Sequence, residues 1–168
     1  MIEALAAALL LGGINTIADY ISLELRLQSR PIYMFARILL ICYCVGGIVG
    51  ARARQLIMGT VGGLMIGALV SAAYYLLAPG LGWWALAVAW VLFWLSFSLL
   101  DALLHGNASV ASGLLQGAAA AVLSAGFYYG ITNIWTEPQA RDPNLWRVLV
   151  SWSTAFFPGF IVLFWRKL

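Results

Sequence analysis

The chain has 168 residues, of which 64% are hydrophobic and only 9% are charged, and its mean hydropathy is +0.95. Soluble domains have a far more even mixture, so this composition excludes a soluble globular protein and indicates an integral membrane protein. Nine basic and six acidic residues give a formal net charge of +3. Because the basic residues are scattered between long apolar runs, nucleic acid is not expected as a partner.

Charged residues, prolines and glycines divide the sequence into six apolar stretches. A helix needs about 20 such residues to cross the hydrocarbon core of a bilayer. The stretches therefore predict spans over residues 3–24, 32–51, 56–78, 82–104, 108–132 and 144–165. The joints are too short to fold alone, so we expect an all-α bundle of six transmembrane helices with short loops, forming a single domain over 1–168. Basic residues divide almost evenly between the two sides, which leaves the orientation in the membrane open.

Two charged residues, Asp19 and Arg37, clearly fall inside the expected spans. An ionisable group that faces lipid costs several kcal/mol, so both should turn inward, where they could pair. Such a pair either locks the first two helices together or forms the polar wall of a ligand cavity. Asn15 and Gln116 are likewise open to two interpretations, a hydrogen bond between helices or a contact with a ligand.

Small residues recur at every fourth position in the third and fifth expected spans. This spacing puts them on one helical face and is typical of close helix packing in membranes. The pattern leaves open whether the partner helix belongs to the same chain or to another copy. The residues concerned are Gly59, Gly63, Gly67, Ser71, Gly113 and Gly117.

The sequence offers no set of residues suited to catalysis or metal binding. His105 is the only histidine, and its position near Asp101 in an expected loop is more typical of a helix end than of a catalytic dyad. Cys42 and Cys44 lie about 200° apart around a helix, so they can neither bridge nor share a zinc ion. We therefore expect no enzymatic activity, no cofactor and no metal, and membrane lipid as the ligand.

The second half of the chain carries short motifs near the ends of its expected spans. They are the run from Phe97 to Asp101, a loop ending in Asn107, Tyr128 to Gly130 after a Gly- and Ala-rich helix, Phe156 to Gly159, and Arg166 to Leu168. Together they resemble the last three helices of the Insig family of membrane sterol sensors. Upstream, the likeness lies mainly in the number and length of the helices.

The resemblance implies a protein without catalytic activity that holds a sterol or a diacylglycerol-like lipid in a central cavity. It also implies that Asp101 is an exposed carboxylate on one face that binds a membrane-protein partner. The chain departs from the family at Phe97 and Ser98, where the family has a tandem tryptophan, and from Ala102 to His105, where it has basic residues. These departures favour a bacterial inner-membrane relative over an endoplasmic-reticulum protein. They put partner retention in doubt more than lipid binding.

For a bound lipid, the expected polar end is formed by Asn15, Asp19, Arg37 and Gln116, and the expected apolar wall by Tyr74, Trp90, Trp94, Phe97 and Tyr128. Two other classes stay open. One is the substrate-capture subunit of a vitamin transporter, although the almost bare outer loops do not favour it. The other is a ligand-free scaffold whose glycine faces build a homo-oligomer.

Overall fold

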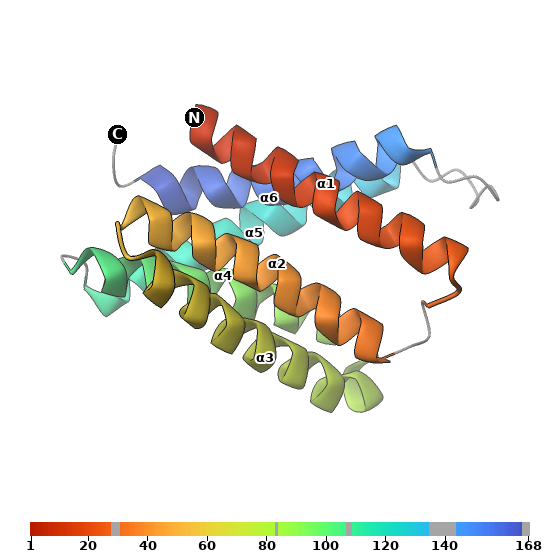
Figure 1. Cartoon of the computed structure of the whole chain (residues 1–168), viewed down its shortest axis with the longest axis horizontal. Coiled ribbons are helices and arrows are strands. Elements are labelled where there is room, and N and C mark those ends of the chain that lie inside the picture. The colour runs from red at the N-terminus through yellow and green to blue at the C-terminus, as the bar shows by residue number, and fades with distance from the viewer. Residues whose placement is uncertain (28–30, 83, 107–108, 135–143, 166–168) are drawn as a thin grey trace.

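The computed structural model describes residues 1–27, 31–82, 84–106, 109–134 and 144–165, and over these residues the protein is a bundle of six α-helices (Figure 1). All six are long and apolar enough to cross a membrane. The predicted all-α architecture is confirmed, and the helices support an integral, multi-pass membrane protein. The helices are α1 (Ile2–Glu24), α2 (Pro31–Arg52), α3 (Leu56–Leu81), α4 (Trp84–His105), α5 (Val110–Ile134) and α6 (Leu145–Phe164).

α3 runs past the end expected for it, whereas α4 ends one residue beyond its expected span and includes Asp101. α3 continues through Pro79 to Leu81 and is followed by Gly82, and α4 continues to His105 and is followed by Gly106. Both glycines have a positive φ, 55° at Gly82 and 67° at Gly106, a backbone conformation in which glycine has no steric penalty. The glycines, rather than the proline or the carboxylate before them, therefore determine where these helices end.

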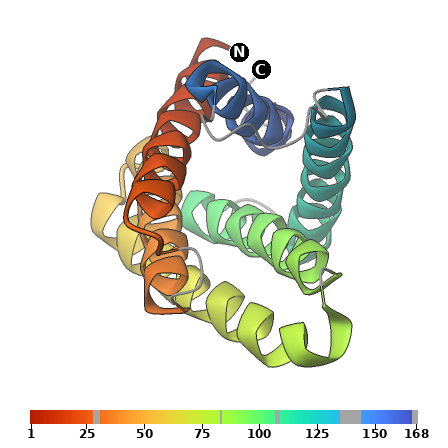
Figure 2. The same cartoon turned by 90° about the vertical axis from the view of Figure 1, so that its right-hand side faces the viewer.

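The helices pack in a cyclic order with one weak contact, and Figure 2 shows α4 between α5 and α3. α1 packs against α6, and the order continues through α5, α4 and α3 to α2. α1 and α2 touch only sparsely. Salt bridges join α1 and α2 near both ends of the bundle. Arg37 pairs with Asp19 at one end, and Arg52 pairs with Glu3 at the other. We call the end with Met1 and the last turn of α6 the terminal end, and the other the opposite end.

The core between α4 and α6 is aromatic. Trp94 and Phe97 on α4 and Phe156 and Phe160 on α6 are all fully buried. The Trp94 ring lies against Gly159, where an added Cβ atom would overlap the indole. Gly159 thus makes room for the largest side chain in the core, and this contact determines how closely α4 and α6 approach.

The glycine faces of α3 and α5 pack against other helices of the same chain. Gly59 and Gly63 of α3 meet Gly46 and Gly50 of α2 backbone to backbone, and Gly67 meets Cys42. The face continues to Ser71, which is fully buried. On α5, the atoms nearest to Gly113 and Gly117 belong to α4. The partner helices that the sequence left open therefore belong to the same chain.

Asn144 caps the first turn of α6. Its side-chain oxygen accepts hydrogen bonds from the backbone N–H groups of Trp146, at 3.1 Å, and Arg147, at 3.4 Å. Replacing Asn144 with alanine is expected to lower the free energy of unfolding by about 1 kcal/mol, because these two N–H groups lose their acceptor. Reversible denaturation in mixed micelles would measure the change. The N144D variant keeps an acceptor and should retain wild-type stability, so an equal loss in both variants would contradict the capping role.

Candidate functional site

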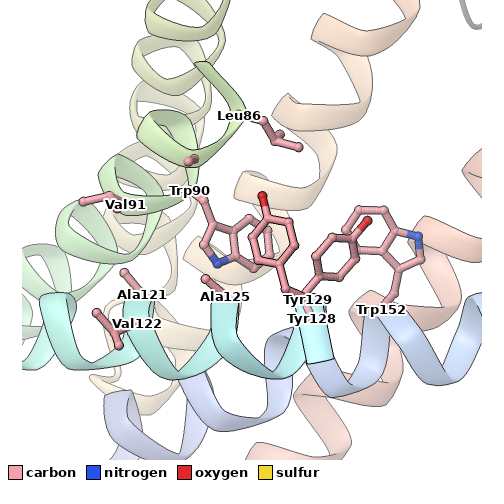
Figure 3. Close-up of a pocket in the computed structure, with 10 residues that line it drawn as sticks. Leu86, Trp90, Val91, Ala121, Val122, Ala125, Tyr128, Tyr129 and Trp152 are labelled. Carbon is pink, nitrogen blue, oxygen red and sulfur yellow. The ribbon is translucent and has the colours of Figure 1, made fainter. Parts of the chain in front are cut away.

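A cavity of about 180 Å³ lies between α4, α5 and α6 towards the opposite end of the bundle (Figure 3). It exists because α5 presents Ala121 and Ala125, whose short side chains do not fill the space in front of Trp90. Nearly the whole wall is apolar. The lining residues are Leu86, Ala87, Trp90 and Val91 on α4, Ala121, Val122, Ala125, Tyr128 and Tyr129 on α5, and Trp152 on α6.

Aromatic rings connect this cavity to the core. The ring centroids of Tyr128 and Trp152 are 5.5 Å apart, and those of Trp152 and Phe156 are 6.2 Å apart with nearly parallel planes. Phe156 in turn lies 5.5 Å from Trp90. Because each ring packs on the next, the aromatic side of the cavity is preorganised and does not have to form when a ligand enters.

A cluster of polar groups lies directly behind this wall. The Trp152 Nε1 atom donates a hydrogen bond to Asp19 Oδ2 at 2.7 Å, and Arg37 Nη1 donates to Asp19 Oδ1 at 2.5 Å. Arg37 also donates through Nε and Nη2 to Asn15 Oδ1, at 3.1 and 2.7 Å, and its guanidinium lies over the Trp152 ring. The expected Asp19–Arg37 pair therefore forms, and it links α1, α2 and α6.

The cluster supports the cavity from behind and does not line it. The Arg37 side chain is only 9% exposed, and that of Asp19 is 32% exposed, with both of its oxygens accepting from protein donors. Of this cluster only Trp152 lies in the cavity wall. The arrangement can orient the Trp152 ring through a charge-assisted hydrogen bond, and it leaves the cavity surface itself uncharged.

The structure separates the residues expected to form the apolar wall. Trp90 and Tyr128 line the cavity. Trp94 and Phe97 are completely enclosed in the core and do not reach it. Tyr74 lies on α3, partly buried and 5.3 Å from the ring of Tyr75, outside the cavity lining.

The four residues expected to form the polar end of the site lie in two separate places. Asn15, Asp19 and Arg37 form the cluster described above, whereas Gln116 is bound elsewhere. Its Nε2 atom donates to the backbone carbonyls of Val162, at 2.5 Å, and Leu163, at 3.1 Å, and so ties α5 to α6. Gln116 lies about three turns of α5 from Tyr128, so it is too distant to contact the same part of a ligand.

The expectation that Asp101 is an exposed carboxylate is wrong. The residue is 5% exposed, and its Oδ1 atom lies 3.3 Å from His105 Nδ1. Because α4 continues to His105, Asp101 lies within the helix, on the face that also buries Phe97 and Ser98. The burial of Asp101 corrects its predicted exposure, and its role in binding a partner stays a prediction.

Sequence reasoning missed Ala121 and Ala125 of the cavity wall, and it left Trp152, one of the deeper tryptophans, without an assignment. A signal for them exists, because Ala121, Ala125 and Tyr128 follow the spacing of one helical face. Trp152 likewise precedes the core residue Phe156 by one turn. The spacing does not indicate that this face of α5 borders a cavity.

The described residues contain no group of three or more His, Cys, Asp or Glu side chains placed to hold a metal ion. Comparison with protein-family models, with curated proteins and with solved structures finds no match for this chain, so the resemblance to the Insig family rests on the sequence motifs alone.

Proposed function

We propose that this protein is a non-enzymatic, Insig-like membrane protein of a bacterial inner membrane that binds a lipid through an alkyl chain. The observation that carries the proposal is the apolar cavity between α4, α5 and α6, with an aromatic wall fixed from behind by Asp19. Such a cavity attracts alkyl groups by close packing and provides no charged group for a water-soluble ligand.

The size of the cavity favours one chain of a diacyl lipid over a whole sterol. Its volume of about 180 Å³ is slightly above the roughly 150 Å³ of an engineered cavity that holds benzene. It is below the roughly 300–1,000 Å³ of pockets that enclose drug-sized ligands. A single chain can enter with the rest of the lipid remaining in the bilayer, whereas a rigid sterol nucleus would have to be enclosed as a unit.

Filling the cavity tests the proposal. The A125L variant places three more carbons in the space in front of Trp90 and should displace about two methylene groups of a bound chain, at about 0.8 kcal/mol each. Lipid retention should then fall about tenfold. Native mass spectrometry of protein released from mild detergent would measure the lipid-bound fraction.

The matched control is A119L, an exposed position on the same helix outside the cavity lining. It should retain lipid like the wild type. Equal retention by A125L and A119L would place the lipid elsewhere, and a wild-type protein that carried a vitamin would favour the transporter class. An empty oligomer would favour the scaffold class, although Gly59 and Gly63 are already covered by α2.

A further inference from the structure

Trp90 has a buried hydrogen-bond donor without a partner at the cavity wall. No acceptor among the described residues reaches its Nε1 atom, and an indole nitrogen can only donate. In Figure 3 this nitrogen lies on the edge of the ring that faces α5, the helix that carries Ala121 and Ala125. Within hydrocarbon no water satisfies such a donor, so an N–H group in this position favours any ligand that brings an acceptor.

Two neighbouring tryptophans show what distinguishes Trp90. The Nε1 atom of Trp152, which also lines the cavity, is already bound to Asp19. The Nε1 atom of Trp94 has no partner either, but its ring is completely enclosed in the core against Gly159, where no ligand can reach it. Of these three indoles, only Trp90 combines an unsatisfied donor with a ring in the cavity wall, and because its Nε1 atom is itself covered there, a ligand acceptor reaches this atom only when the indole shifts.

The depth of Trp90 also restricts the ligand. It lies six residues after Trp84, the first residue of α4, which corresponds to about 9 Å along a helix whose 22 residues match the thickness of the hydrocarbon core. A charged headgroup at this depth would be costly. An uncharged acceptor, such as an ester carbonyl or a hydroxyl group, can lie there if its alkyl chain fills the apolar remainder of the cavity.

We propose that the cavity selects an alkyl chain that carries an uncharged acceptor oxygen, and that Trp90 makes this selection by donating a hydrogen bond from Nε1. This inference rests on the proposed function, since it requires that a chain enters the cavity. It adds that the cavity binds a plain hydrocarbon chain more weakly than one with an acceptor oxygen. It also identifies Trp90 as the residue that determines this specificity.

The test uses the full-length protein in nanodiscs and three probes of matched length, methyl pentadecanoate, hexadecanol and heptadecane. Each probe competes with an alkyl diazirine, and labelling of the peptide that contains Ala121 and Ala125 is measured. Wild-type protein should bind at least one oxygen-bearing probe about tenfold more tightly than the alkane. Comparison of the ester with the alcohol identifies the source of the oxygen.

The W90F variant keeps an aromatic ring but removes the donor. Its smaller ring changes binding of all three probes, so the readout is the ratio of affinities, which should fall from about tenfold to near one. The matched control W94F removes an equally unpaired donor outside the cavity and should keep the preference. A preference that survives in W90F, or is absent from the wild type, overturns the role of Trp90. If no probe reduces labelling at the cavity, the proposed lipid site itself is wrong.

Discussion

Replacing Arg37 with methionine is expected to destabilise the bundle by about 3 kcal/mol, the lower end of the range for a buried pair, because the Asp19 side chain is 32% exposed. The variant leaves the carboxylate of Asp19 inside a membrane span with the Trp152 N–H as its one remaining donor of the cluster, and Asn15 Oδ1 loses both of its donors. The loss should be large because α1 and α2 touch only sparsely, so little apolar packing compensates for it. Reversible unfolding in mixed micelles would measure the change in free energy.

The double variant D19N/R37M provides the control, because it removes both charges at once. It should recover much of the stability that R37M loses, since a buried pair can often be replaced by neutral groups at little cost. A double-mutant cycle with D19N then isolates the energy of the pair. A loss below about 1 kcal/mol in R37M, the size typical of a hydrated surface pair, would show that water reaches this cluster.

The spans and the charge pair could be predicted because the bilayer restricts the alternatives. Only a helix satisfies its own backbone in hydrocarbon, and an isolated Asp19 or Arg37 would be too costly there, so apolar length and pairing follow from the sequence. The same reasoning failed at Asp101. A charge there indicates the start of a loop, but α4 continues to His105, whose Nδ1 atom lies 3.3 Å from the buried carboxylate, and Arg52 of α2 provides an opposite charge near it.

The cavity could not be predicted, because its position depends on which residues face each other across helices. Trp90 and Trp94 lie one turn apart on α4 and are equivalent in composition. Trp94 meets Gly159 of α6 and fits closely, whereas Trp90 lies opposite Ala121 and Ala125 of α5, which leave space. Periodicity indicates the face on which a residue lies, but it does not indicate the size of the side chains opposite.

The close approach of α2 and α3 is expected to make G59A strongly destabilising. An added Cβ atom at Gly59 would overlap the backbone of Gly46 and Gly50. These backbone atoms cannot move unless the whole of α2 shifts. Overpacking of this kind costs about 1–3 kcal/mol, and a value near the upper limit is expected because the clash involves backbone on both sides. The free energy of unfolding in mixed micelles is again the quantity to measure.

The matched control is G126A on α5, where no atom lies within 4 Å of the added Cβ. There, alanine should stabilise the helix by about 0.5–1 kcal/mol, because glycine loses more backbone entropy on folding. The same chemical change is therefore expected to have opposite signs at the two positions. If G59A were also neutral or stabilising, α2 and α3 would have to be able to separate without loss of stability, and the glycine contact would not determine their packing.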